Sequence, residues 1–326
     1  MSGEGKVVCV TGASGFIASW LVKHLLHRGY TVHATVRSLK DPNKVAHLLA
    51  LDGAKERMHL FEADLLDENS FDPAINGCEG VFHTASPVSF SPSATKVELV
   101  DPAVKGTLNV LGSCVRTPSV KRVVVTSSTA AVMYKSNPIS PTDVIDETWF
   151  SDKEFAEETK ELGIEQGRVQ SHYDSQSAIF LAKNQVYHAR IKNVDVGFHK
   201  VRELVASGEI LWQKIHTRKD FMTSSPLLNC YVDVRDVANA HIEAFEMPSA
   251  SGRYCLVGEP MHSSQLLKIV GQVYPSLAIP EKYKEDLPIF KVSQEKAKSL
   301  GINFTSIEVS LKDTVESLKE KNFLRF

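Results

Sequence analysis

Three small residues follow the first apolar run of the chain, "KVVCV", at a spacing that could hold phosphate groups. Gly12, Gly15 and Ala18 lie at intervals of three in "TGASGFIAS". Gly12 would allow a tight turn, Gly15 would let the backbone approach a pyrophosphate, and Ala18 would let the next helix pack closely. The amino end of that helix offers free N–H groups to an anion. Ordinary turns also contain such glycines, but the strand before and the helix after favour dinucleotide binding.

The end of the next apolar run indicates which dinucleotide would bind. Arg37 closes the run in "HATVRS", and Lys44 lies in the following segment. An NAD site usually has an acid here for the ribose hydroxyls, whereas a cation suits the 2′-phosphate of NADP. An arginine can also grip a phosphate with two hydrogen bonds. Both cations could instead form a solvated surface pair, but the position of Arg37 favours NADP(H).

Two further strand ends carry residues that could contact the same cofactor. Asp64 follows "HLFEA" and could accept a hydrogen bond from the adenine amino group, or equally cap the next segment as a favoured N-cap residue. Thr84 to Ser86 end the run "GVFHTAS", at the edge of the sheet where ligands bind. The candidate cofactor-binding residues are therefore Gly12, Ser14, Gly15, Phe16, Ile17, Arg37, Lys44, Asp64, Leu65, Thr84, Ala85 and Ser86.

Strand-like runs alternate with helical patterns around these residues. A helix is expected from about 15 to 27, ended by Gly29, and further strands in "YTVHATVR", "HLFEAD", "GVFHTAS" and "RVVVTSS". This alternation predicts an α/β fold with a doubly wound parallel sheet. Later, "CYVDVRDVANAHIEAFE" indicates a strand and then a helix, and the tail indicates two helices around a short extended piece. We expect a dinucleotide-binding domain over residues 1–250 and a smaller substrate lobe over 251–326.

Composition limits the partners and the compartment. The 326 residues are 43% hydrophobic, enough for a large core, and the formal charge of -2 gives no reason to expect nucleic acid or a membrane as partner. The amino terminus has no signal-peptide pattern, and no apolar run could span a bilayer. The five cysteines are scattered without a CxxC pair, which favours small buried hydrophobes in a reducing compartment over disulfides or metal ligands. We expect a cytoplasmic protein with a small-molecule partner and no metal.

Longer stretches resemble a known family. "VCVTGASGFIASWLVKHLLHRGYTVHATVR", "VKRVVVTSSTAAV" and "YVDVRDVANAHIEAFEMPSASGRYCLVGE" resemble the plant extended short-chain dehydrogenases/reductases. The group includes cinnamoyl-CoA reductases, dihydroflavonol reductases and alcohol dehydrogenase-like relatives, and the resemblance covers roughly 5–162 and 230–326. It implies a Rossmann-type fold and an oxidoreductase of CH–OH donors. Its reaction would be NADPH-dependent reduction of an aldehyde, ketone or acyl-CoA carbonyl of the phenylpropanoid or flavonoid type.

The resemblance also implies a catalytic serine. In the family a serine binds the carbonyl oxygen, a tyrosine donates the proton, and a lysine four residues later holds the nicotinamide ribose. Because a free phenol titrates near ~10, that ammonium is needed to make the tyrosine a usable acid. The serine corresponds to Ser128, the second serine of "VTSSTA". The alternative is that Ser128 only caps the next turn.

The tyrosine and the lysine have no counterpart. None of the eight tyrosines has a lysine four residues later, and without gaps Gly163 stands at the tyrosine and Gly167 at the lysine. Tyr173 begins a helical-looking stretch, but Ser177 stands where its lysine should be. From 163 to 230 strand signals fade, so we expect this segment to be the least ordered.

Three hypotheses therefore stay open. The first is an active reductase, and the second is an NADP(H)-binding protein with little catalysis. The third is a product of an altered exon boundary or reading frame, because family-like sequence resumes in register at "YVDVRDV". The departing segment also holds four histidines that could supply an acid or metal ligands, but their spacing favours surface positions: His172, His188, His199 and His216. The reductase is favoured, because most of the chain resembles the family.

Overall fold

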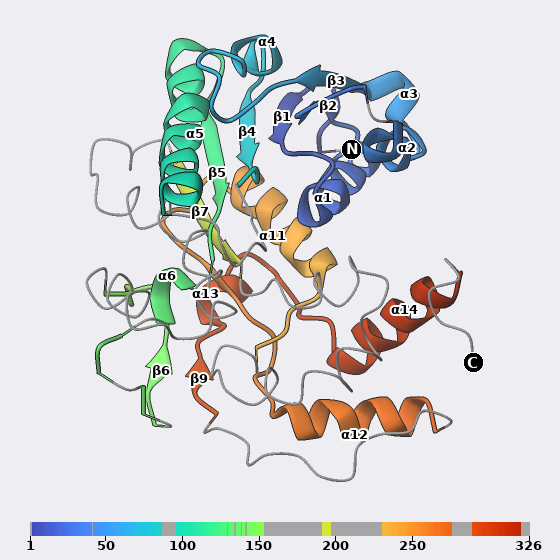
Figure 1. The fold of residues 1–326 in the computed structure, drawn as a ribbon, viewed down its shortest axis with the longest axis vertical. Helices are drawn as coiled ribbons and strands as arrows, with labels where there is room; N and C mark the ends of the chain where they lie inside the picture. The colour runs from blue at the N-terminus through green and yellow to red at the C-terminus, as the bar shows by residue number, and fades with distance from the viewer. Residues whose placement is uncertain are drawn as a thin grey trace.

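The fold is built around one central sheet with helices on both faces (Figure 1). The structure is a computed structural model. It describes residues 2–40, 42–86, 96–128, 130–133, 135–137, 139–140, 142–152, 191–196, 230–275 and 289–320.

The central sheet has seven strands, and every neighbouring pair is parallel. Their order is β3-β2-β1-β4-β5-β7-β8, so the winding reverses direction between β1 and β4. This confirms the doubly wound sheet, and ligands of such sheets bind at the carboxyl ends of the strands beside the reversal. The strands are β1 (Val7–Thr11), β2 (Thr31–Val36), β3 (Met58–Glu62), β4 (Gly80–His83), β5 (Arg122–Thr126), β7 (Ile191–Val196) and β8 (Cys255–Leu256).

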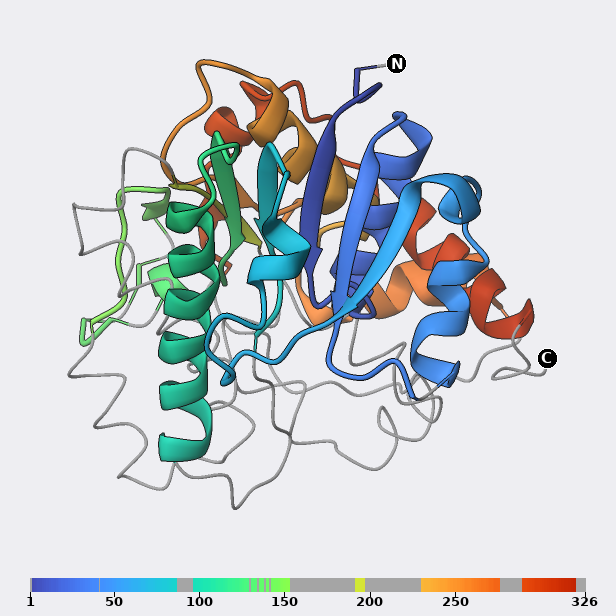
Figure 2. The same cartoon turned by 90° about the horizontal axis from the view of Figure 1, so that it is seen from above.

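Two buried cores cover the two faces of the sheet. Helices α1 (Phe16–His27) and α11 (Val234–Glu246) pack side by side on one face. Helices α4 (Asp72–Ile75) and α5 (Lys96–Arg116) lie on the other face, in front of the sheet in Figure 2. Successive side chains of β5 point to opposite faces of the sheet. Val124 therefore belongs to the core under α1 and α11, whereas Val123 and Val125 belong to the core under α4 and α5.

Helix α1 begins and ends as its sequence predicts. Gly15 is its N-cap residue, and the chain leaves the helix through Gly29, which has φ +89°. Only glycine adopts that backbone conformation at no cost, so it is a natural terminator. Helices α2 (Pro42–Leu49) and α3 (Ala54–Arg57) then connect β2 to β3.

A second, two-stranded sheet lies apart from the central one. Strand β6 (Val144–Ile145) pairs with β9 (Lys291–Val292), below the main sheet in Figure 1. The remaining described helices are α6 (Ala130–Met133), α12 (Ser263–Val273), α13 (Glu295–Lys298), which packs against β8 of the main sheet, and α14 (Ile307–Glu320), which packs against α12. The two expected tail helices are thus present. The division at residue 250 stays a prediction, because β6 precedes it and joins the small sheet, whereas β8 follows it and joins the main one.

Two expectations about strands were wrong. Residues 230–233 form no strand; instead Asp233 caps α11 by accepting a hydrogen bond from the Arg235 N–H. Strand β7 lies inside the segment where strand signals fade, because polar residues interrupt "IKNVDV" and pairing with β5 and β8 supplies what the pattern lacks. Most of 163–230 lies outside the described residues, including Gly163, Gly167, Tyr173 and the four histidines. The expected disorder of this segment stays a prediction.

The cysteines lie in the interior of the fold. All five cysteines are buried and free, as expected of small apolar residues. Burial raises the pKa of the Cys78, Cys114 and Cys230 thiols to about 12, which makes them poor nucleophiles. In the part of the chain that the structure describes, no helix is both long and apolar enough to cross a membrane.

Candidate functional site

The turn after β1 is held between the ends of two neighbouring strands. Gly12 has φ +65°, and a Cβ added there would lie 3.0 Å from the Cα of Ala85. On the other side, the Ala13 N–H donates to the Thr35 carbonyl oxygen at 2.8 Å, and the Gly12 N–H donates to the Thr35 hydroxyl at 3.2 Å. Both the backbone conformation and the missing side chain are therefore required at Gly12.

The amino end of α1 is open to an anion. Gly15 caps the helix with no side-chain hydrogen bond, and no acidic residue lies in the first turn. A Cβ on Gly15 would lie 3.1 Å from the Gly12 carbonyl oxygen, so the loop is compact. The half-buried residues Ser14, Phe16 and Ile17 surround this end. The first N–H groups of the helix and its dipole would attract a pyrophosphate here.

A buried hydrogen-bond network fixes the residues that follow β4. The Thr11 hydroxyl accepts from the N–H groups of Thr84, at 3.1 Å, and Ala85, at 3.0 Å. Its own proton is therefore left for His83 Nδ1, at 2.8 Å. His83 then carries its proton on Nε2 and faces the Thr107 hydroxyl of α5 at 3.4 Å. Burial lowers the pKa of His83 to about 4, so the ring is neutral at physiological pH.

Two cations lie where a 2′-phosphate would be held. Arg37 follows β2 directly and is exposed, and Lys44 is exposed on α2. The loop between them is held down, because the Leu39 N–H donates to a Glu62 carboxylate oxygen at 3.0 Å. Arg37 has no hydrogen-bonding or ionic partner within the described residues, so its guanidinium is available to an anion.

Asp64 caps a turn rather than a helix. Its carboxylate accepts from the Leu66 N–H at 2.8 Å, but no helix begins there, which corrects the helix-cap alternative. Leu65 packs against α5, where a Cβ on Gly106 would lie 2.7 Å from its side chain, and its carbonyl accepts from the Asn109 amide at 2.9 Å. The contact of Asp64 with adenine stays a prediction.

Two buried serines follow the end of β5. The Thr126 hydroxyl donates to His241 Nε2 at 2.7 Å, because Nδ1 of that ring faces the Val237 carbonyl at 2.8 Å and must carry the proton. Burial lowers the pKa of His241 to about 4. Ser127 and Ser128 follow directly and are 6% and 3% exposed. The Ser128 carbonyl accepts from a backbone N–H three residues later, so a turn begins there.

Sequence reasoning missed the groups that hold this site together. Thr11, Thr35 and Thr126 orient the loops through their hydroxyls, and His83 and His241 join two of them to helices. The signal was present, because a threonine lies at or next to the carboxyl end of β1, β2, β4 and β5. Nothing in the sequence showed which helix each threonine would meet.

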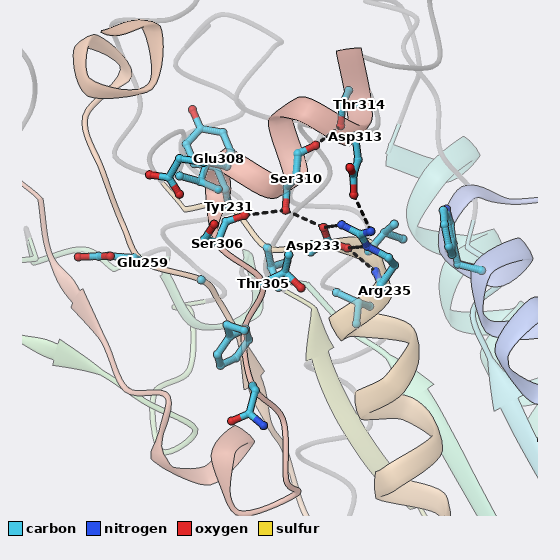
Figure 3. A pocket seen from close by; sticks show the side chains of 18 of the residues that line it. Tyr231, Asp233, Arg235, Glu259, Thr305, Ser306, Glu308, Ser310, Asp313 and Thr314 are labelled. Atoms are coloured by element: carbon cyan, nitrogen blue, oxygen red, sulfur yellow. Dashed lines mark hydrogen bonds and ion pairs between the residues drawn. The ribbon is translucent and has the colours of Figure 1, made fainter. Parts of the chain in front are cut away.

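A pocket of about 880 Å³ opens beside this site. It lies between the first turns of α1, the amino end of α11 and helix α14, and Phe16 and Ile17 are among its walls. Figure 3 shows that Asp233, Arg235, Ser310 and Asp313 are turned toward one another. Arg235 bonds to Asp233 at 2.7 Å and to Asp313 at 2.6 Å, and the Ser310 hydroxyl donates to Asp233 at 2.6 Å.

These pocket carboxylates are structural. Burial opposes the ionisation of Asp233, but hydrogen bonds from Arg235 and Ser310 outweigh it and hold its pKa below the usual value. The group is therefore a paired carboxylate that ties α14 to α11. Ser128 is not among the pocket residues, so chemistry at Ser128 would occur outside this pocket.

The described residues fit a dinucleotide. The glycine turn and the amino end of α1, which has no side-chain cap, suit a pyrophosphate, and Arg37 suits a phosphate on the ribose of the adenosine half. Together these positions span the ends of β1, β2 and β4, beside the reversal of strand order. Within the described ranges, no group of three or more His, Cys, Asp or Glu side chains could hold a metal ion.

Known proteins with similar sequences and folds include several reductases. The sequence model described as "NAD dependent epimerase/dehydratase family" matches residues 8–155. Cinnamoyl-CoA reductase CAD2 of Medicago truncatula is 50% identical, over 99% of this chain and 98% of that protein.

Solved structures extend the similarity to the fold. Vestitone reductase from alfalfa has a TM-score of 0.73 at 29% identity, over 98% of this chain and 99% of its own. Gre2 of Candida albicans, solved as an NADPH complex, has a TM-score of 0.76 at 26% identity, over 97% of this chain and 99% of its own. The chain belongs to the NAD dependent epimerase/dehydratase family, among the plant extended short-chain dehydrogenases/reductases.

Proposed function

We propose that the chain is an NADPH-dependent reductase of small carbonyl compounds of the phenylpropanoid or flavonoid type. The observation that carries this proposal is the Gly12 turn, which is held against the ends of β2 and β4 and leads into α1, a helix whose amino end has no side-chain cap. The 50% identity to a cinnamoyl-CoA reductase supports the carbonyl substrate, which would be an aldehyde, a ketone or an acyl-CoA thioester. The buried thiols fit a reducing compartment such as the cytoplasm.

Each part of the cofactor has residues that would hold it. The Gly12 turn and the first turn of α1 bind the pyrophosphate, and Arg37 and Lys44 bind the 2′-phosphate. Asp64 with Leu65 would contact the adenine, and the backbone of Thr84–Ser86 would line the middle of the cofactor. Bound NADPH supplies the hydride.

Ser128 would act on the substrate. Its hydroxyl donates a hydrogen bond to the carbonyl oxygen and stabilises the negative charge that develops there when the carbon accepts hydride. With an aldehyde or ketone, that oxygen must then take a proton; with an acyl-CoA thioester, the carbonyl re-forms as the C–S bond breaks, and the leaving thiolate takes the proton. Because glycines stand at the family's tyrosine and lysine positions, the proton comes from water, and the step is slower than with a positioned acid. The reverse reaction would oxidise the CH–OH group of an alcohol to an aldehyde or ketone, with the hydride going to NADP⁺.

A second candidate is an NADP(H)-binding protein with little turnover. The observation that favours it is the sequence around 163–167, which lacks the Tyr-x-x-x-Lys pair. If the segment 163–230 came from an altered exon or frame, another reading frame of the coding transcript would contain family-like sequence there. Finding none in any frame would exclude that origin.

An NADPH-oxidation assay tests the proposal. The unmodified chain and Ser128→Ala are compared on aromatic aldehydes, cinnamoyl thioesters and dihydroflavonols. We expect slow NADPH-dependent reduction of at least one class by the unmodified chain and loss of it in Ser128→Ala. Tight cofactor binding without turnover on any class would favour the second candidate.

A further inference from the structure

The hydroxyl of Ser127 is buried and unpaired. Its residue is 6% exposed, and Ser127 Oγ has no hydrogen-bond partner in the part of the chain that the structure describes. Buried hydroxyl groups in folded proteins nearly always have a partner, because an unsatisfied one loses its bonds to water without replacement. A ligand that binds at this position would supply the missing partner.

The strand register sets where Ser127 lies. Val123 and Val125 face the core under α5, so alternation along β5 puts Ser127 on that side. In the pairing of β4 with β5, His83 lies opposite Val125. Continued two residues past this pair along both segments, the register would place Ser127 level with Ala85.

Ala85 is the residue that a Cβ on Gly12 would touch, at 3.0 Å. Gly12, Ala85 and Ser127 therefore form a row across the adjacent ends of β1, β4 and β5. The row runs from the pyrophosphate turn away from Arg37, which follows β2 on the other side of β1.

One half of a dinucleotide follows this row. With the 2′-phosphate at Arg37 and the pyrophosphate at Gly12, the second half of the cofactor extends over β4 toward β5. That half begins with a ribose that carries two hydroxyl groups. We propose that Ser127 Oγ forms a hydrogen bond with a hydroxyl of the nicotinamide-side ribose, which makes Ser127 a positioning residue for the hydride donor; this inference rests on the proposed cofactor.

The contact between Ser127 and the ribose would replace the lysine–ribose contact of the family, for which this sequence has no lysine. The resemblance assigns the nicotinamide ribose to a lysine, and Gly167 stands at that position. A neutral hydroxyl bonds less strongly than an ammonium, so Ser127 would hold the ribose but contribute little to its charge environment. Loss of one neutral hydrogen bond corresponds to about a threefold to tenfold loss in affinity.

Two ligands separate this contact from the others. NADPH contains the nicotinamide-side ribose, whereas 2′,5′-ADP carries the adenosine half with its 2′-phosphate and lacks it. Calorimetric titration of the full chain should show Ser127→Ala weakening NADPH binding about threefold to tenfold and leaving 2′,5′-ADP binding unchanged. Ser113→Ala is the matched control, a buried serine on α5 whose hydroxyl accepts from Arg116, and it should change neither affinity. Ser127→Thr, which keeps the hydroxyl, should retain most of the NADPH affinity.

Other outcomes overturn the inference. An equal loss for both ligands in Ser127→Ala would mean a structural effect on the whole site, and no loss for NADPH would mean no contact. If unmodified protein binds 2′,5′-ADP as tightly as NADPH, the nicotinamide half makes no useful contact, and the inference fails while the cofactor assignment stands. If neither ligand binds, the proposed function fails and the inference with it.

Discussion

Gly12 and Ala85 meet so closely that a Cβ on the glycine would lie 3.0 Å from the Cα of Ala85. This contact joins the end of β1 to the segment after β4, at the point where the strand order reverses. Thr11 reinforces it by accepting hydrogen bonds from the N–H groups of Thr84 and Ala85. The floor of the cofactor site is therefore a contact between two backbones, with no space for a side chain.

The first prediction concerns this contact. Gly12→Ala should weaken NADPH binding at least about tenfold and destabilise the fold by about 1–3 kcal/mol, because it adds backbone strain and a clash. Gly77→Ala is the control, since Gly77 has φ +76° and nothing within 4 Å of an added Cβ. Denaturant unfolding and NADPH titration of both variants check this. Similar effects on binding from both variants would show that crowding at Ala85 plays no part.

The second prediction concerns the choice of cofactor. Arg37→Ala should cost roughly tenfold to a hundredfold in NADPH affinity, because charge-assisted hydrogen bonds contribute about 1.5–3 kcal/mol each. The affinity for NADH should change little, since it has no 2′-phosphate. Lys40→Ala removes another exposed cation from the same loop and serves as the control. If the two variants lose NADPH affinity equally, general charge rather than a specific contact explains the binding.

The third prediction concerns acid stability. His83 and His241 have pKa values of about 4 in the folded protein, against about 6.5 for unfolded histidine. Between these values the unfolded chain binds more protons, so the free energy of unfolding falls as pH falls from 6.5 toward 4 and is constant above that window for these groups. Each of the two histidines should lower the free energy of unfolding by about 2 kcal/mol at pH 5.

Urea unfolding at pH 7.5 and pH 5 measures this loss, and imidazole nitrogen shifts report on each ring. The rings of His83 and His241 should stay neutral at pH 5 in the folded protein. A urea midpoint that does not change between the two pH values would contradict the assignment of both rings as buried and neutral.

The fourth prediction concerns the rate. General acid catalysis typically contributes 10²–10⁴-fold, so turnover should be at least about a hundredfold below that of a relative with the tyrosine and lysine. Gly163→Tyr combined with Gly167→Lys should not restore it alone, because the surrounding segment also shapes the site. Replacing the whole segment 163–230 by that of an intact relative should. Ordinary rates in the unmodified chain that Tyr173→Phe abolishes would instead identify Tyr173 as the acid.

Local chemistry decided which parts of the fold could be predicted from sequence. Gly12, Gly15 and Gly29 act through their own backbone conformations, so their spacing was enough to predict the turn and the ends of α1. The apolar runs of β1, β4 and β5 are buried along most of their length on both faces, and a continuous apolar run of this kind can be recognised without knowing which strands lie beside it.

The remaining features depend on distant partners. The sequence predicts a strand that includes Asp233. In the structure its carboxylate instead caps α11 and accepts further hydrogen bonds from the Arg235 guanidinium and the Ser310 hydroxyl. Strand β7 is hidden by its polar residues until β5 and β8 pair with it. The unpaired hydroxyl of Ser127 is likewise invisible in "VTSSTA", because burial and partners are properties of the folded chain.

Calorimetric titration of the unmodified chain with NADPH and with NADH tests the central claim most directly. The turn at Gly12 can bind the pyrophosphate of either dinucleotide, whereas Arg37 can distinguish them through the 2′-phosphate. We predict that NADPH binds at least about tenfold more tightly than NADH. Equal affinity for the two, or no binding of either, would contradict the account.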